Sequence, residues 1–221
     1  MLGIITGTSL IGKRFDGTEK TVRTKYGDAW LFEGDRALFL PRHGMNADIP
    51  PHKINHLANI AAMQKSGVNG VVGVYSTGSL KIGIPPGTLV VPRDYIDFGG
   101  CITFYDDEIR HVMPELDQGL RGRLVRASHG RDEGVYIQTR GPRFETKAEV
   151  SVLSQYADLV GMTMASEATL CSEIDIPFAA ICTVDNYANG VVKQELSYDT
   201  VVKNAEKNRK MVEETIARMI G

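Results

Sequence analysis

The sequence predicts an α/β fold in a single domain, with a central mixed or parallel β-sheet flanked by helices. Two observations support this. Short apolar runs alternate along the chain with segments of helical periodicity, which is typical of a sheet covered by helices on both faces. No internal repeat, low-complexity tract or Pro/Gly/Ser-rich linker interrupts the 221 residues. One domain spanning residues 1–221 is therefore expected.

The apolar runs are short enough to be buried strands. They cover residues 2–5, 30–32, 37–40, 70–75, 88–91, 134–139, 159–160 and 178–183. Helical patterns are predicted over residues 51–66, about 147–155, 167–173 and 198–220. The first of these has Gly67 as a natural stop.

The last helix carries the clearest signals. Ser197 is an expected N-cap, and Asp199 places a carboxylate in the first turn, where the helix dipole favours it. The apolar positions along this helix are spaced to form one buried face. That face comprises Val201, Val202, Ala205, Val212, Ile216 and Met219.

Composition excludes several classes of function. Hydrophobic residues make up 43% and charged residues 24%, as in ordinary globular proteins. A net charge of −2 gives no electrostatic basis for binding nucleic acid or a membrane surface. The cysteines Cys101, Cys171 and Cys182 show no metal-ligand spacing, so free thiols in a reducing cytoplasm are expected. No signal peptide, membrane span or metal site is expected.

One short segment is suited to bind a flat heterocycle. Residues 141–146 (Gly-Pro-Arg-Phe-Glu-Thr) follow an apolar run and precede a helical stretch. Phe144 can stack on a ring, and Glu145 can accept a hydrogen bond from a ring N–H.

Other strand ends carry hydroxyl groups and glycines that suit an oxyanion. In open α/β sheets, ligands bind at the carboxyl ends of strands. Residues 6–9 form a possible anion nest, and Arg42 and His43 supply a guanidinium fork and a further donor. Residues 75–79 form another polar turn, and Thr163 could donate while Met162 packs on a sugar. Each signal is weak alone, and residues 6–9 could be a plain polar turn; together they predict an oxyanion site.

A further strand end, residues 184–190, carries Asp185 and Asn186. Both could simply form a turn. Beside a heterocycle, however, the Asn186 amide could both donate and accept hydrogen bonds.

With these motifs in order, the chain resembles the trimeric purine nucleoside phosphorylase and methylthioadenosine phosphorylase family along nearly its whole length. The resemblance rests on Thr8-Ser9 and on residues 41–44, 51–56, 77–80, 86–88, 141–146, 161–163 with Glu167, and 185–187. It implies reversible phosphorolysis of a purine nucleoside, with inorganic phosphate as co-substrate and no cofactor. It also implies a homotrimer or a dimer of trimers.

The resemblance assigns roles to individual residues. It implies that phosphate is held by Thr8, Arg42, His43, Ser76 and Thr163. It implies that Met162 lies against the ribose, that Phe144, Glu145 and Asn186 hold the base, and that Gly78 allows close backbone approach. Asn186, as a donor near N7 of the departing purine, and Glu145 and His43 are the residues expected to act in catalysis.

Base preference follows from Glu145, Asn186 and Ala188. Relatives that take 6-aminopurines are expected to have aspartates near residue 186 and a small hydroxyl residue in place of Glu145. A carboxylate accepts hydrogen bonds only, so it suits the N1–H of a 6-oxopurine. Adenine has a lone pair at N1 instead, so the carboxylate of Glu145 would face another acceptor. Inosine, guanosine or S-methyl-5′-thioinosine are thus the expected substrates. A one-residue slip would instead place Asp185 at the base.

Two matters stay open at this point. Apolar residues at the start of the last helix favour a 5′-methylthio group or broad tolerance, and His111 either reaches a neighbouring subunit's site, as in relatives, or is a solvated loop residue. The alternative functions are a 5′-methylthioadenosine phosphorylase and a catalytically silent nucleoside-binding protein. Tyr75, and the hydroxyls in the first loop where relatives carry more glycine, leave room for the silent protein.

Overall fold

The computed structural model describes residues 1–13, 15, 17–98, 100, 102–193 and 196–221. The strands are β1 (Leu2–Thr6), β2 (Thr18–Thr24), β3 (Gly27–Glu33), β4 (Ala37–Pro41), β5 (Val71–Ser79), β6 (Leu89–Val90), β7 (Asp94–Asp97), β8 (Val135–Gln138), β9 (Leu159–Gly161) and β10 (Phe178–Tyr187). The helices are α1 (His56–Lys65), α2 (Gln118–Ser128), α3 (Lys147–Leu153), α4 (Met164–Glu173) and α5 (Tyr198–Ile220). Within this part of the chain, no helix is both long and apolar enough to cross a membrane.

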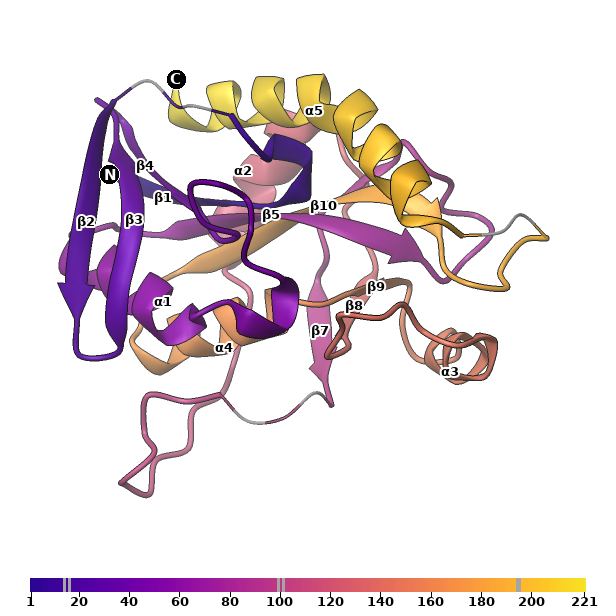
Figure 1. Ribbon diagram of the computed structural model, residues 1–221, viewed down its shortest axis with the longest axis horizontal. Helices are drawn as coiled ribbons and strands as arrows, with labels where there is room; N and C mark the ends of the chain where they lie inside the picture. The colour runs from indigo at the N-terminus through magenta and orange to yellow at the C-terminus, as the bar shows by residue number, and fades with distance from the viewer. Residues whose placement is uncertain (14, 16, 99, 101, 194–195) are drawn as a thin grey trace.

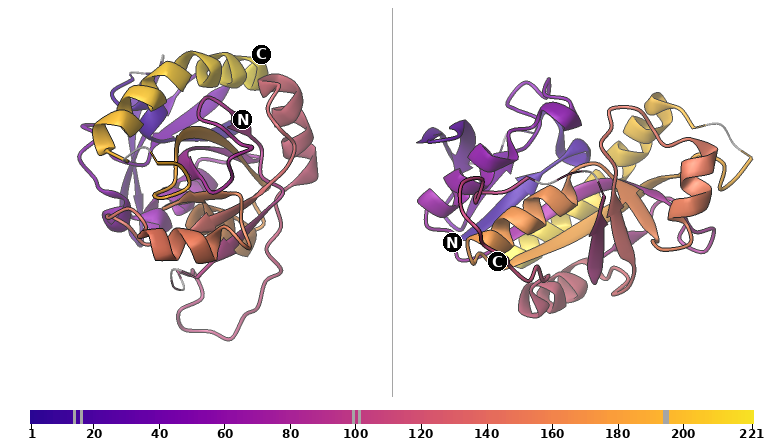
Figure 2. Two further views of the ribbon diagram at one scale, coloured as in Figure 1. Left: turned by 90° about the vertical axis from the view of Figure 1, so that its right-hand side faces the viewer. Right: turned by 90° about the horizontal axis from the view of Figure 1, so that it is seen from below.

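All of these strands belong to one mixed sheet. Its order is β2-β3-β4-β1-β5-β9-β8-β7, and β10 pairs with β5 and with the short β6. Helices α2 and α5 cover one face, and α1 and α4 cover the other (Figures 1 and 2). Helix α3 lies at the end near β8 and β9. The predicted fold class, an α/β domain with a mixed sheet between helices, is confirmed.

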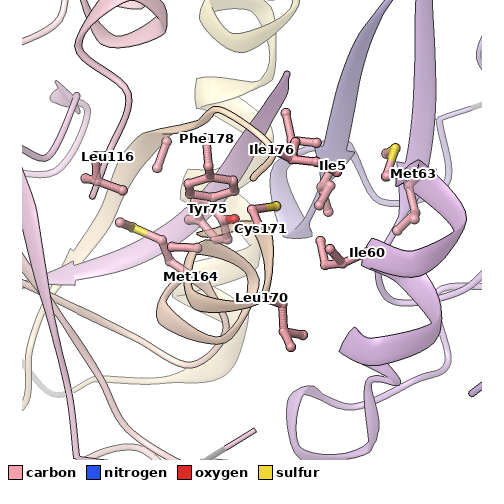
Figure 3. Packing of buried hydrophobic residues seen from close by; sticks show 14 of the residues in the cluster. Ile5, Ile60, Met63, Tyr75, Leu116, Met164, Leu170, Cys171, Ile176 and Phe178 are labelled. Atoms are coloured by element: carbon pink, nitrogen blue, oxygen red, sulfur yellow. The ribbon is translucent and has the colours of Figure 1, made fainter. Parts of the chain in front are cut away.

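Each face of the sheet has its own hydrophobic core. Under α1 and α4, Met63, Leu170 and Cys171 pack with Tyr75 and Phe178 of the central strands (Figure 3). Under α2 and α5, apolar residues of both helices pack on the opposite side of the same strands. Cys171 and Cys182 are buried free thiols, as expected; Cys101 lies outside the described residues. The central strands β5 and β10 are therefore covered on both faces.

Helix α5 confirms its sequence signals most closely. It spans Tyr198–Ile220, and the Ser197 hydroxyl accepts a hydrogen bond from the backbone N–H of Thr200. The predicted face is buried except for Val202, which is half-buried. The structure adds Asn208 and Thr215 to the buried face, two polar positions that an apolar pattern does not reveal.

The helix predicted over residues 51–66 is wrong at its start. A 3₁₀ turn spans Pro51–Lys53, and α1 begins only at His56. The side chain of Asn55 accepts a hydrogen bond from Ala58 N and so caps the helix. Gly67 follows the helix with φ of +72°, which agrees with the predicted stop.

Elements β2, β7 and α2 were not predicted. β2 is a polar strand at the edge of the sheet in which only Val22 is buried, so it lacks an apolar run. α2 carries few apolar residues among several arginines and glycines. Its N-cap Asp117, which accepts a hydrogen bond from Leu120 N, is the signal that could have located it.

Two predicted turns are strand in the structure. Residues 75–79 were expected to form a loop, but β5 continues to Ser79; residues 184–187 were expected to form a turn, but β10 continues to Tyr187. The reason is that β5 and β10 pair in parallel along their lengths, with a register shift between Val184 and Asn186. Pairing between distant strands overrides the local turn tendency of glycine and hydroxyl residues.

The edge of β5 that faces away from β10 changes partner along its length. β1 pairs with β5 as far as Gly73, and β9 pairs with it at Gly78 and Ser79. Residues 74–77 lie between these two stretches, where β1 and β4 end. The carboxyl ends of several strands therefore converge beside the middle of β5.

Candidate active site

A cavity of about 520 Å³ opens at this convergence. All the residues predicted to form the site line it except His111. They are Thr8, Arg42, His43, Ser76, Gly78, Phe144, Glu145, Met162, Thr163, Asn186 and Ala188. His111 lies in an exposed stretch between β7 and α2 and is not among the lining residues of this chain's cavity.

The polar residues proposed for phosphate come from four places in the fold. Thr8 opens a 3₁₀ turn after β1, and Arg42 follows β4. Ser76 lies within β5, and Thr163 is the N-cap of α4. The N-terminus of α4 adds a favourable dipole for an anion. These groups give one part of the cavity the chemistry of an oxyanion site.

Arg42 is already held by the protein. Its Nε and Nη2 donate to the two carboxylate oxygens of Glu167 at 2.8 and 3.0 Å, and its Nη1 donates to the Val74 carbonyl at 2.7 Å. Both side chains are buried. Burial by itself would raise the pKa of Glu167. The Arg42 guanidinium, together with His56, whose Nδ1 lies 3.4 Å from Glu167 Oε1, outweighs it and brings that pKa to about 2. The ion pair therefore stays intact over the physiological pH range.

His43 is fixed in one tautomer. Its Nδ1 lies 2.8 Å from the carbonyl oxygen of Ile49, which can only accept, so Nδ1 carries the proton. Burial, and then the nearby Arg42 charge, lower the pKa of His43. The neutral ring consequently offers Nε2 as an acceptor. The sequence analysis treated His43 as a donor; in this tautomer its free nitrogen suits the P–OH group of monohydrogen phosphate instead.

Asp185 and Asn186 face in different directions. Asp185 occupies the register shift of β10 and is fully buried. Its carboxylate accepts hydrogen bonds from the hydroxyls of Ser76 and Thr183 and from Asn208 Nδ2 of α5. Asn186 lines the cavity. Asp185 is not among the residues that line the cavity, and the Ser76 hydroxyl proton is directed to Asp185.

The burial of Asp185 gives a prediction for stability. Burial raises its pKa from an ordinary value of 3.8 to about 6. The folded state then binds more protons than the unfolded state between these values, so this carboxyl lowers stability as pH rises from about 4 to 6. Asp185→Asn should remove that decline, which is on the order of 3 kcal/mol.

Denaturant unfolding at pH 4.5, 6 and 7.5 tests this expectation. The stability of Asp185→Asn relative to wild type should improve as pH rises. A difference that stays constant across the three pH values would contradict the assigned role of burial.

The opposite part of the site is built around Glu145. This side chain is 6% exposed, and the Thr139 hydroxyl donates to its Oε1 at 2.6 Å. The Asn189 amide donates to the Glu145 backbone carbonyl at 3.1 Å. Because Thr139 engages Oε1, Oε2 is the oxygen best placed to accept a hydrogen bond from a ligand.

The loop that carries Phe144 and Glu145 is anchored by helix capping. Thr146 is the N-cap of α3 and forms a capping box with Glu149, in which each side chain bonds the other's backbone N–H. The Thr-x-x-Glu spacing signals this cap in the sequence. Phe144 and Glu145 thus lie immediately before a fixed helix end.

Asn186 sits where β5 and β10 pair. It is opposite Gly78 in register, and a Cβ added at Gly78 would lie 3.1 Å from Asn186 Nδ2. Asn186 Nδ2 donates one hydrogen bond, to the Tyr187 carbonyl at 2.9 Å. An amide has a second N–H and a carbonyl oxygen, which suit adjacent donor and acceptor atoms of a ring.

Apolar and aromatic side chains also line the cavity. Among them are Met162, and Tyr198 and Val201 from the first turn of α5. These two α5 residues belong to the apolar segment that the sequence analysis placed near the 5′ position.

Sequence reasoning missed Thr139, whose hydroxyl donates to Glu145 and which carries no signal beyond its position at a strand end. It named Tyr75 only as a reason to consider a silent protein, whereas the Tyr75 hydroxyl donates to Glu167, the partner of Arg42. Glu167 was noted as part of a motif but without a role.

Comparison with known proteins agrees with this architecture. The model of the phosphorylase superfamily matches residues 11–221. The chain belongs to that superfamily. It is 40% identical to a probable 6-oxopurine nucleoside phosphorylase of Archaeoglobus fulgidus, covering 99% of this chain and 97% of the relative. It is 38% identical to a probable S-methyl-5′-thioinosine phosphorylase of Methanocaldococcus jannaschii, covering 92% and 85%.

A solved structure also resembles this phosphorylase. The methylthioadenosine phosphorylase of Schistosoma mansoni in complex with adenine superposes with a TM-score of 0.92 at 25% identity, covering 99% of this chain and 90% of the other. The resemblance to the purine nucleoside and methylthioadenosine phosphorylase family, inferred from the motifs, is confirmed.

Proposed function

We propose that this phosphorylase cleaves the N-glycosidic bond of 6-oxopurine nucleosides with inorganic phosphate. The observation that carries the proposal is the buried Glu145 carboxylate, oriented by Thr139, in the same cavity as Asn186. A carboxylate that can only accept suits the N1–H of hypoxanthine or guanine, and guanine adds a 2-amino donor. The names of the relatives from A. fulgidus and M. jannaschii support the same substrate class.

The proposed reaction uses both groups of residues in the cavity, those assigned to phosphate and those assigned to the base. A phosphate oxygen attacks C1′ of the ribose, the bond from C1′ to the purine nitrogen breaks, and its electron pair leaves with the base. Negative charge near C1′ stabilises a transition state with oxocarbenium character. Asn186 donates to N7 as charge develops on the purine. The proton that monohydrogen phosphate loses ends on the departed purine, so the products are the neutral free base and ribose 1-phosphate.

Binding and catalysis divide among named residues. Thr8, Arg42, Thr163 and the backbone beside Ser76 hold phosphate, and neutral His43 accepts a hydrogen bond from its P–OH group. Phe144 stacks on the base and Met162 contacts the sugar. The proposal requires phosphate as co-substrate and no metal or organic cofactor.

The apolar wall supports a 5′-methylthio group as an accepted substituent. Tyr198 and Val201 line the cavity with an aromatic ring and an aliphatic side chain, and we assign them to the 5′ position, where a methylthio group can pack on them. S-methyl-5′-thioinosine is therefore proposed as a substrate alongside inosine and guanosine, with 5-methylthioribose 1-phosphate as its product.

Assembly and location extend the proposal. We propose a cytoplasmic homotrimer or dimer of trimers in which the stretch bearing His111 reaches a neighbouring subunit. The start of that stretch is anchored to α4, because Glu173 accepts hydrogen bonds from Thr103 Oγ1 and Phe104 N at 2.5 and 2.7 Å. His111 is exposed beyond this anchor.

One assay tests the function. Purified protein is given inosine, guanosine, S-methyl-5′-thioinosine, adenosine and 5′-methylthioadenosine, each with and without phosphate, and base release is followed. Release from the 6-oxopurine nucleosides only with phosphate is expected. Release from adenosine-type substrates alone would indicate a methylthioadenosine phosphorylase, release without phosphate a hydrolase, and no release a binding protein.

A further inference from the structure

Two features of the sequence have no role in the proposed reaction. Glu167 belongs to the motif that follows β9, and Tyr75 lies in β5 one residue before Ser76. Neither is among the lining residues of the cavity. Both contact Arg42, and Arg42 does line the cavity. Arg42 is therefore the lining residue that connects both of them to the anion site.

The hydrogen bonds of Arg42 determine what it can offer a ligand. An arginine has five N–H groups. Three are engaged, since Nε and one N–H of Nη2 donate to Glu167 and one N–H of Nη1 donates to Val74 O. Among the contacts of the described residues, one N–H therefore remains on each terminal nitrogen. The carboxylate fixes the plane of the guanidinium and hence the direction of those two donors.

Tyr75 contacts both members of the Arg42–Glu167 pair. Its hydroxyl donates to Glu167 Oε2 at 2.6 Å, and the Arg42 guanidinium carbon lies 4.4 Å from the centre of its ring. The ring is buried within the core beneath α4 (Figure 3). A Cβ at Gly73 would overlap the Tyr75 hydroxyl, and a Cβ at Gly7 would overlap Arg42 Nη1. Glycine at both positions makes room for this arrangement.

The buried pair also determines the charge of the site. Arg42 and Glu167 together carry no net charge, and His43 is neutral in the tautomer set by Ile49. These three side chains therefore give an anion directed donors rather than an excess of positive charge, in addition to the dipole of α4. Affinity that depends on direction is lost when the arginine can rotate.

We propose that Glu167 and Tyr75 are positioning residues that orient Arg42 for phosphate, an inference that rests on the proposed phosphorolysis. The Glu167 carboxylate accepts from Nε and Nη2 of the guanidinium, and the Tyr75 hydroxyl donates to that carboxylate. Disturbing either one should weaken phosphate binding while the purine end, built on Glu145 and Asn186, keeps its geometry.

Tyr75→Phe is the milder test, because it removes one hydroxyl and keeps the ring. The KM for phosphate should rise roughly tenfold, while the KM for inosine stays within about twofold. Tyr95→Phe is the matched control. Its hydroxyl contacts Thr169 Oγ1 of the same helix α4 at 2.8 Å and touches neither Arg42 nor Glu167. Both KM values should stay at wild-type levels in the control.

Glu167→Gln tests the same inference more strongly. A neutral amide accepts from Arg42 with only one oxygen, so the KM for phosphate should rise on the order of 100-fold. Should this variant fail to fold, Tyr75→Phe still decides the matter. Equal rises in the KM for phosphate and inosine, or a Tyr75→Phe variant that behaves like Tyr95→Phe, would overturn the inference.

A binding measurement separates this inference from the proposed function. Inorganic phosphate is titrated into the protein without nucleoside, and the shift in thermal unfolding temperature gives its affinity. Weaker phosphate binding by Tyr75→Phe than by Tyr95→Phe supports the positioning role even if no nucleoside is cleaved. Equal phosphate binding by the two variants contradicts it even if cleavage is found.

Discussion

Glu145→Gln should lower kcat/KM for inosine on the order of 100-fold, because an amide that turns its NH₂ toward N1–H replaces a charge-assisted acceptor with a donor. The Thr139 hydroxyl, which donates to Oε1, favours that unproductive orientation by keeping the remaining amide oxygen for itself. The KM for phosphate should stay within about twofold of the wild-type value, since Glu145 is not one of the residues assigned to phosphate. Steady-state kinetics with inosine and phosphate each varied in turn measure both values.

Glu133→Gln provides the control for this experiment. It removes an exposed carboxylate that pairs with Arg131 at 3.2 Å and is not among the residues that line the cavity. Its kinetics should match those of wild type. Comparable losses in turnover and in phosphate affinity for Glu145→Gln would mean that Glu145 supports the loop and does not hydrogen-bond to the base.

Asn186→Ala should lower kcat for inosine by a factor on the order of 10² to 10³, the usual effect of removing one donor from developing negative charge. The KM for inosine should change far less, because the hydrogen bond to N7 strengthens mainly in the transition state. Initial rates at saturating inosine and phosphate measure the loss.

A nucleoside methylated at N7 makes this prediction specific. Its base is already cationic, so its departure needs no donor at that nitrogen. Wild type and Asn186→Ala should therefore cleave 7-methylguanosine at rates that differ by less than about tenfold. If the variant loses as much activity on 7-methylguanosine as on inosine, Asn186 acts on something other than the leaving group.

The local parts of the site could be predicted from the sequence. Three motifs lie next to apolar runs: the 141–146 segment, the hydroxyl groups after β1 and the Arg42-His43 pair. Each can be recognised from its own residues even when the exact end of the neighbouring strand is not known. Helix α5 was predictable for a similar reason, because its cap and periodicity lie within one segment. Most strands were also identified, because central strands of such a sheet are continuous apolar runs.

The parts that could not be predicted depend on distant partners. Gly78 and Asn186 lie in strands because β5 and β10 pair with each other, and glycine and asparagine by themselves favour turns. Arg42 looks like a free cation until the fold brings Glu167, which is 125 positions away, against it. The acceptor role of His43 depends on the carbonyl of Ile49, which no side-chain pattern records.

The register shift at Asp185 has a consequence for how this enzyme type can change its substrates. Side chains along a strand alternate between its two faces, and the one extra residue decides which neighbour meets the purine. An amide faces the cavity and a carboxylate faces α5, although the two are adjacent in the chain. Moving the irregularity by one position would exchange them without altering any amino acid. Selection for one nucleobase over another therefore acts on the hydrogen-bonded alignment of two backbones as well as on the residues that touch the ring.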